Sequence, residues 1–410
     1  MRSQKARHLL ICIALAVPFA AGCGIVEPGD TFDIPRAVTR PVKVSGDQQF
    51  TAIASGFFHS CALDTAGRAW CWGGNLYRQT GQSDPGVPCD NGSARCIVRP
   101  SLVETNLTFA AISAGVTHSC ALTSEGLAYC WGGGYVNERG ILGDGQMTLS
   151  AKPVPVAGGL RFKSISAGGR ITCAVSTDDK GYCWGLGGMV GDGTENDALS
   201  PVQVAGNLSF TSVSAGGLHA CGVTTAGAMW CWGSNQLGQI GDGRVTGLPM
   251  GAGSGPSAPV RVNTEKVFES VVAGGGHTCG VTRESEVLCW GQNHVGQLGI
   301  GAPGQPQSTP RMVVGGSGLR GVAANAVHTC ALKPDGAARC WGGNWFGAIG
   351  DGTSTAQNTG SERFVPTPPI TSVLFSQISA GGSHTCALAK DGRAWCWGDR
   401  ARGQMGDGKA

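Results

Sequence analysis

The 410-residue sequence lacks the short motifs that mark many catalytic sites. It has no Gly-x-Ser-x-Gly nucleophile elbow, no His-Glu-x-x-His zinc motif and no phosphate loop that ends in Gly-Lys-Ser or Gly-Lys-Thr. Only 14% of the residues are charged, and no run of Lys or Arg is present to attract a phosphate backbone. We therefore expect no catalytic residue, no cofactor, no metal site and no nucleic-acid partner.

Glycine and cysteine are abundant instead. The 69 Gly follow no strict Gly-X-Y period, which excludes collagen, and a hydrophobic content of 41% excludes a disordered polyelectrolyte. Eighteen Cys are typical of an exported protein, whose thiols can oxidise to disulfides.

Residues 1–22 have the pattern of an export signal, with three basic residues before an apolar run that is too short to span a membrane. Removal of this segment leaves 27 basic and 27 acidic residues, so the mature chain is neutral. The next residues, Ala20-Ala21-Gly22-Cys23, are similar to the lipobox of bacterial lipoproteins, in which the Cys is lipidated. Plain secretory cleavage nearby is the alternative.

Cysteine parity favours lipidation. Loss of Cys12 with the signal leaves an odd number of Cys, whereas a lipid on Cys23 leaves sixteen that can all pair. We predict a lipoprotein of the outer membrane or cell surface, with residues 23–39 as its tether.

Seven copies of one pattern follow the tether. Each copy holds two Cys at the same spacing, whereas successive copies lie 48 to 59 residues apart, which is typical of a rigid hairpin followed by a variable loop. The predicted disulfides of the copies are Cys61–Cys71, Cys120–Cys130, Cys173–Cys183, Cys221–Cys231, Cys279–Cys289, Cys330–Cys340 and Cys386–Cys396.

The last copy illustrates the hairpin. Pairing Cys386 with Cys396 centres a turn near Asp391 and places Leu388 opposite Ala394. Both Cys then lie on one face as cross-strand neighbours, close to disulfide reach.

A short strand marked by Pro and Val ends each copy after its loop, most clearly in residues 153–156, 201–204, 259–262 and 310–313. The last copy lacks this strand, but residues 40–44 (Arg-Pro-Val-Lys-Val) supply it at the other end of the chain. The pattern predicts an all-β, seven-bladed β-propeller over residues 40–410, closed by an N-terminal strand that completes the last blade. An open solenoid is the alternative, although the end copies are not polar caps.

Three kinds of residue recur in the copies, and we interpret each as structural. The Trp of each Trp-Gly step is predicted to be core. A ring of His would suggest a zinc site, but Zn ligands must approach to about 2.0–2.1 Å and separate blades cannot converge so closely. The recurring His is therefore predicted to bond within its own blade turn. The Asp of Gly-Asp-Gly is predicted to form a turn rather than a Ca²⁺ site. These residues are Trp72, Trp131, Trp184, Trp232, Trp290, Trp341 and Trp397; His59, His118, His219, His277, His328 and His384, with Ile171 in the third copy; and Asp144, Asp192, Asp242, Asp351 and Asp407.

Cys89 and Cys96 lie outside the repeat, in a Pro- and Gly-rich insertion. We expect them to bond to each other and to stiffen a projecting loop, since redox catalysis usually requires Cys-x-x-Cys.

The copies resemble the repeats of the regulator of chromosome condensation family. The resemblance is clearest in Gly275-Gly276-His277-Thr278-Cys279 and in residues 290–299, Trp-Gly-Gln-Asn-His-Val-Gly-Gln-Leu-Gly. It implies a seven-bladed propeller over roughly residues 40 to 410 and, through the eukaryotic namesake, guanine-nucleotide exchange on a small GTPase and chromatin binding. An export signal and a cysteine pair in every blade do not suit that activity.

The most variable positions lie in the Asn-x-x-Gly loop after each Trp-Gly step, and symmetry places these loops on one rim. They hold Trp, Tyr and Arg, the residue types enriched at binding hot spots. The candidate binding residues are Tyr77, Arg78, Tyr135, His294, Trp345, Phe346, Arg400 and Arg402. Packing of these side chains between the blades is the alternative.

These observations favour an envelope-anchored, monomeric propeller that binds a protein partner through one rim without catalysis. One alternative is an enzyme that acts on an envelope or extracellular polymer at the channel mouth. The other is the exchange activity implied by the resemblance.

Overall fold

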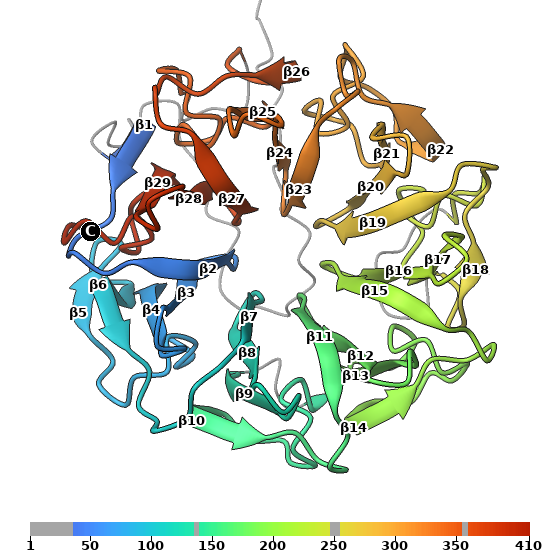
Figure 1. The fold of residues 1–410 in the computed structure, drawn as a ribbon, viewed down its shortest axis with the longest axis horizontal. Coiled ribbons are helices and arrows are strands. Elements are labelled where there is room, and N and C mark those ends of the chain that lie inside the picture. Colours follow the sequence, from blue (N-terminus) through green and yellow to red (C-terminus); the bar gives the residue numbers. More distant parts are fainter. Residues whose placement is uncertain (1–35, 135–138, 247–254, 355–359) are drawn as a thin grey trace, which may run out of the picture.

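The computed structural model of the protein describes residues 36–134, 139–246, 255–354 and 360–410. In these residues seven antiparallel sheets stand around a central channel, and together they form the disc seen in Figure 1. The predicted all-β, seven-bladed propeller is therefore confirmed. No helix in the described ranges is long and apolar enough to cross a bilayer.

The strands follow the chain blade by blade. Blade 1 has β2 (Phe50–Ser55), β3 (His59–Asp64), β4 (Ala69–Gly74), β5 (Val87–Cys89) and β6 (Ala94–Leu102). Blade 2 has β7 (Ala111–Ala114), β8 (His118–Leu122), β9 (Ala128–Gly132) and β10 (Ser150–Pro155), and blade 3 has β11 (Phe162–Ala167), β12 (Ile171–Ser176), β13 (Gly181–Gly185) and β14 (Ala198–Gln203). Blade 4 has β15 (Phe210–Ala215), β16 (His219–Thr224), β17 (Met229–Gly233) and β18 (Val260–Arg261).

The other three blades repeat this order. Blade 5 has β19 (Phe268–Ala273), β20 (His277–Thr282), β21 (Val287–Gly291) and β22 (Gln307–Met312). Blade 6 has β23 (Arg320–Ala324), β24 (His328–Leu332), β25 (Ala338–Gly342) and β26 (Arg363–Thr367). Blade 7 has β27 (Phe375–Ala380), β28 (His384–Ala389), β29 (Ala394–Asp399) and, from the other end of the chain, β1 (Ala37–Lys43).

Strand β1 closes the ring as predicted. It pairs antiparallel with β29, from Ala37 opposite Asp399 to Lys43 opposite Trp395. The strand begins three residues before the predicted Arg40, because Ala37 and Val38 also find partners on β29. The two ends of the chain therefore share one sheet, which removes the open edge of a solenoid.

All eight predicted disulfides are present. In the last hairpin Cys386 lies opposite Cys396 and Leu388 opposite Ala394, which confirms the predicted register. The same register recurs in the other six blades, so each hairpin disulfide joins the two middle strands of its blade.

The outer strand of most blades is interrupted by proline. Register shifts occur in six of the pairings between outer and third strands. Proline lacks the N–H that a ladder needs and fits at a sheet edge or bulge, so these residues protect the rim from pairing with another chain. The residues are Pro41, Pro100, Pro153, Pro201, Pro310 and Pro366.

The seven repeat tryptophans are fully buried, which confirms that they are core. In most blades the Trp ring lies about 6 Å from a Phe at, or just before, the start of the innermost strand, as in the pair Phe50 and Trp72 at 6.2 Å between centroids. The indole N–H of Trp131 reaches the preceding blade, where it donates to the carbonyl of Gln79 at 3.1 Å. The same side chain therefore fills its own blade and joins it to its neighbour.

The prediction for the recurring histidines was wrong. Each imidazole Nε2 lies within hydrogen-bond distance of a hydroxyl in the next blade rather than of a group in its own turn. In every blade but the sixth, a glycine between strands one and two lets the neighbouring blades approach closely. The pairs are His59–Ser119, His118–Thr172, His219–Thr278, His277–Thr329, His328–Thr385 and His384–Ser60, at 2.8–2.9 Å.

Candidate functional site

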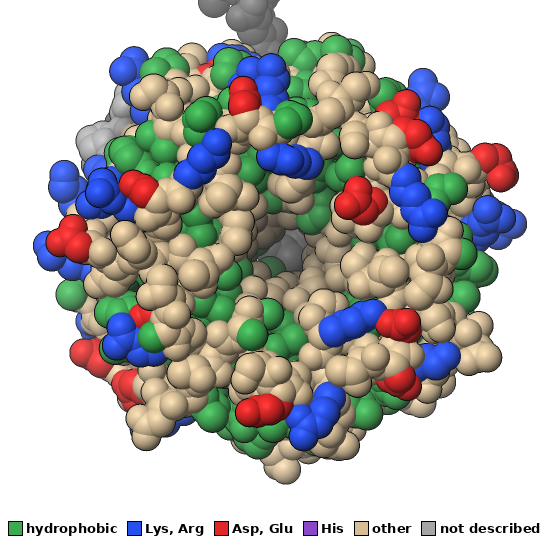
Figure 2. All heavy atoms as spheres, viewed as in Figure 1, with side chains coloured by type: hydrophobic (Ala, Val, Ile, Leu, Met, Phe, Trp, Pro, Cys, Tyr) green, Lys and Arg blue, Asp and Glu red, His purple; other side chains and the backbone are tan. Residues whose placement is uncertain are grey.

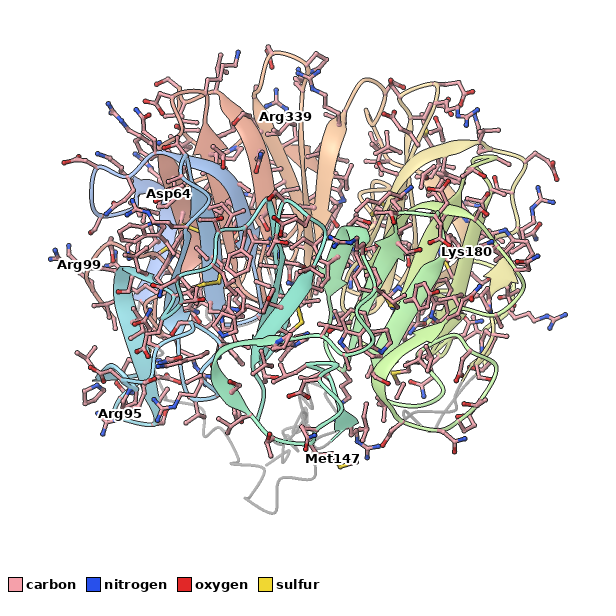
Figure 3. All side chains as sticks on the ribbon, turned by 60° about the horizontal axis from the view of Figure 1, so that its bottom comes forward. Asp64, Arg95, Arg99, Met147, Lys180 and Arg339 are labelled. Atoms are coloured by element: carbon pink, nitrogen blue, oxygen red, sulfur yellow. A yellow bond between two sulfur atoms is a disulfide. The ribbon has the colours of Figure 1, made fainter. Side chains whose placement is uncertain are left out.

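The disc has two faces of different construction. One, the loop face, carries the loops between the third and fourth strands and the turns between the first and second strands; the other, the turn face, carries the hairpin turns. In Figure 3 Arg95 and Met147 lie toward the loop face, and Asp64 and Lys180 lie toward the turn face. Figure 2 shows the turn face, where acidic and basic side chains are interspersed around the central hollow.

Loops on the loop face are held by asparagine and aspartate. Asn235 Nδ2 donates to Asp242 Oδ1 at 3.1 Å, and Asn235 Oδ1 accepts from the backbone of Ile240. The Asp of every Gly-Asp-Gly step accepts from a backbone N–H two residues later, which confirms the predicted turns. These loops therefore present their variable side chains on a fixed backbone.

The predicted binding residues of blades 1, 5 and 6 all reach the loop face. Tyr77 and Arg78 are half-buried, and Arg78 occupies a left-handed conformation with φ 62°. His294 is exposed, and Trp345 and Phe346 are half-buried. Tyr135 lies outside the described residues, as do the signal segment and Cys23.

Arg400 and Arg402 have partners inside the protein. Arg400 pairs with Asp407 at 2.8 Å, and Arg402 pairs with Asp90 at 3.2 Å. The Arg402 guanidinium also lies 4.0 Å from the centroid of the Phe58 ring. Arg402 therefore joins blade 7 to blade 1, whereas Arg400 braces the last loop of blade 7.

The junction also uses the insertion in blade 1. Asp90, inside the loop closed by Cys89 and Cys96, pairs with Arg36 at 3.0 Å as well as with Arg402, and its N–H donates to the carbonyl of Ala401. The disulfide was predicted to stiffen a projecting loop, but this hairpin instead docks onto blade 7. We call Arg36, Asp90 and Arg402 the closure latch.

Two further aromatic residues were missed by the sequence reasoning. Phe57 and Phe58 lie in the turn between β2 and β3, with ring centroids 4.5 Å apart, and both are half-buried. The signal was present, because no other copy has two aromatics directly before its recurring His. We call Phe57, Phe58, Tyr77, His294, Trp345 and Phe346 the aromatic arc; its members come from blades 5, 6 and 1.

Asp399 ends β29 and lies at the start of the last loop of the chain. Burial raises the pKa of Asp399, and the neighbouring Asp90 acts in the same direction. Asp399 accepts from the backbone of Ala401 at 2.9 Å. Its bond holds the last loop of the chain beside the closure latch.

The central channel has a cavity of about 200 Å³ lined by the innermost strands. Among the described residues its wall consists of Ala, Ser, Gly, Val and Asn side chains. Serines of one blade accept backbone N–H groups of the next, as in Ser113 with Ala167 at 2.9 Å. The channel wall thus serves to join the blades.

The structure defines a seven-bladed propeller with one face of variable loops, and comparison with known proteins names the class. Two descriptions of the regulator of chromosome condensation (RCC1) repeat match this chain. The first covers residues 50–79, 109–138, 210–239, 268–297 and 375–404, and the second covers residues 125–175, 226–281 and 284–332. The matches span more than half of the sequence, so the chain belongs to the RCC1 repeat family.

Relatives by sequence include proteins of several kinds. The ultraviolet-B receptor UVR8 of Arabidopsis thaliana is 30% identical over 307 residues, which are 72% of this chain and 54% of UVR8. The mitochondrial RCC1 domain-containing protein RUG3 of the same plant is 28% identical over 369 residues, 86% of this chain and 66% of RUG3. The probable E3 ubiquitin-protein ligase HERC4 of Rattus norvegicus is 36% identical over 140 residues, 33% of this chain and only 13% of the ligase.

Solved structures share the fold at low sequence identity. Human WBSCR16 superposes with a TM-score of 0.72 and 19% identity, over 86% of this chain and 90% of WBSCR16. Yeast RCC1 (Prp20), solved bound to Kap60, superposes with a TM-score of 0.68 and 20% identity, over 89% of this chain and 82% of that chain. These similarities support the propeller architecture.

Proposed function

We propose that this protein is an exported, lipid-anchored propeller of the cell envelope that binds a protein partner through its loop face without catalysis. The observation that carries the proposal is the aromatic arc, which places six aromatic or imidazole side chains on the loop face of blades 5, 6 and 1. Four of them lie on loops whose backbone is held by Asn75, Asn293 and Asn344. Tyr and Trp are enriched among hot-spot residues, and rigid loops reduce the entropy that binding costs.

The family supports protein binding. The yeast propeller is described as bound to Kap60, and a second structure of it concerns its binding to Gsp1p and histones. Those partners belong to the yeast protein. What we transfer to this chain is the use of a propeller face as a protein-binding surface.

Two observations weigh against the other activities. A hydrolase or lyase at the channel mouth would need acid and base groups, whereas the described residues of the channel wall offer hydroxyl, amide and apolar groups. Exchange on a cytosolic GTPase conflicts with the predicted export signal of residues 1–22.

Capture of partners from envelope extract tests the binding. A variant with Phe57, His294 and Trp345 replaced by Ala is expected to lose the partner that the unaltered protein captures. A variant with Lys333, Asp335 and Lys390 replaced by Ala on the turn face is the matched control and should keep it. Loss of the partner in both variants, or in neither, would contradict binding through the loop face.

The anchor is tested separately. Mass spectrometry of the mature N-terminus should find Cys23 as the first residue, carrying lipid. An unmodified Cys23 would remove the anchor from the proposal and would leave the binding face untouched.

A further inference from the structure

The hydrogen bonds of the six interface histidines show which ring nitrogen carries the proton. Ser119 Oγ donates to the carbonyl of Gln79 at 2.9 Å, so the same hydroxyl must accept the proton of His59 Nε2. The Thr partners of four other histidines donate to carbonyls in the same way, at 2.9–3.0 Å. At the closing interface, Ser60 bonds to His384 at 2.9 Å and lies 3.4 Å from Ser55. The pattern places the proton on Nε2 of each ring and the lone pair on Nδ1.

The Nδ1 atoms are buried and have no hydrogen-bond partner within the described part of the chain. All six side chains are fully excluded from solvent. A second proton would therefore place a cation in a dry interface without an acceptor, which is strongly unfavourable.

The electrostatic surroundings add to this cost. Burial lowers the pKa of His118, His219 and His328 to about 4 and that of His59, His277 and His384 to about 3. The charged groups that bear on these rings are other histidines, which repel a proton. His59 faces His118 and His384; His277 faces His219, His328 and His294; and His384 faces His328.

The seventh interface has a different composition. Blade 3 has Ile171 where the other blades have His, and blade 4 has Ala220 where the others have Ser or Thr. Both side chains are fully buried and lie in the same apolar cluster. The donor and its acceptor are thus replaced together, so the His and the hydroxyl act as one unit and this interface holds no proton site.

We propose that the blade interfaces make the ring sensitive to acid. The ring stays closed while the six histidines are neutral. Proton uptake below about pH 6 opens it at every interface except that between blades 3 and 4. The direction follows from linkage. A histidine exposed by opening takes up a proton below its ordinary pKa of about 6.5, whereas the buried one does so only near 3 to 4. The open state therefore binds more protons, and closure weakens as the pH falls from 6.5.

The expected size of the effect is large because the six sites add. Between pH 6 and pH 5 each histidine shifts the ratio of open to closed protein by about eightfold, and six together shift it by about 10⁵-fold. Carboxylates with an ordinary pKa titrate below this range, so most of the uptake between pH 7.5 and pH 5.5 comes from the histidines.

The number of protons taken up is measured by denaturant unfolding of the purified full chain with its disulfides intact. The experiment is repeated at several pH values from pH 7.5 to pH 5.5. We expect the slope of the unfolding free energy with pH to approach an uptake of five to six protons at pH 5.5. The double variant His328→Ile/Thr385→Ala copies the natural apolar pair and should lower the uptake by about one. The reverse variant Ile171→His/Ala220→Thr should raise it by about one.

Hydrogen exchange at pH 5 gives a second readout that needs no variant. Strands β12 and β16, which hold Ile171 and Ala220, should stay protected after β3 and β8 have begun to exchange. An uptake of two protons or fewer, an uptake that neither double variant changes, or equal exchange at all interfaces would overturn the proposal.

Discussion

The closure latch makes a sharp prediction about the weakest point of the ring. Asp90 pairs with Arg36 at 3.0 Å and with Arg402 at 3.2 Å, and the three side chains are only 22%, 22% and 26% exposed. Arg36 directly precedes β1, and Arg402 lies three residues after the end of β29, the strand with which β1 pairs. Replacing Asp90 by Ala therefore leaves two partly buried arginines without their counter-charge at the ring closure.

The magnitude lies between two limits. An exposed ion pair contributes about 0.2–1 kcal/mol, and removing one partner of a fully buried pair costs about 3–5 kcal/mol. Two pairs at roughly one quarter exposure place Asp90→Ala at about 2–3 kcal/mol. For a chain of this size that loss corresponds to a fall of about 3 °C in the unfolding midpoint.

Hydrogen exchange combined with thermal unfolding is the assay. Amides of β1 (Ala37–Lys43) should exchange faster in Asp90→Ala, whereas those of the inner strand β12 should not. Asp47→Ala is the matched control, because Asp47 pairs with Lys43 of the same strand at 3.6 Å but is fully exposed. Unchanged exchange in β1, or an equal effect of both substitutions, would refute the closure role of Asp90.

Two further predictions concern the loops and the hairpins. A methyl group on Gly143 would lie 2.6 Å from Trp184 Nε1, whereas at Gly145 it would meet nothing within 4 Å; both glycines have positive φ. Gly145→Ala should therefore cost about 1 kcal/mol and Gly143→Ala about 2–4 kcal/mol in denaturant unfolding, and equal losses would contradict the packing described. Replacing Cys386 and Cys396 together by Ser should lower the unfolding free energy by about 2–4 kcal/mol, and an unchanged unfolding midpoint would count against a stabilising disulfide.

The repeat made most of the fold predictable. Equal spacing within each copy set the register of the hairpins, since only one pairing brings Cys386 opposite Cys396. The missing outer strand of the last copy then identified the N-terminal strand that closes the ring. Both inferences depend on local pairing and on symmetry, which the sequence displays directly.

Contacts between distant parts of the chain were not predictable in the same way. Arg402 was predicted to bind a partner, but its partner inside the chain, Asp90, lies 312 residues away in an insertion that no other copy shares. The histidines were assigned to their own turns, because their true partners become apparent only when the approach of neighbouring blades is known. The sequence shows Ile171 in place of the recurring His and Ala220 in place of the recurring Ser or Thr. That these two changes belong to one interface becomes clear only when a His of one blade is seen to contact a hydroxyl of the next.

The central claim is that the loop face, and not the turn face, binds a protein partner. The most direct test is the Kd of the captured partner for three proteins: the unaltered chain, the loop-face variant of Phe57, His294 and Trp345, and the turn-face variant of Lys333, Asp335 and Lys390. The account predicts a loss of at least about a hundredfold for the loop-face variant, as expected when hot-spot side chains are truncated, with less than about a twofold change for the turn-face variant. Equal affinities for all three proteins, with unchanged unfolding midpoints, would contradict it.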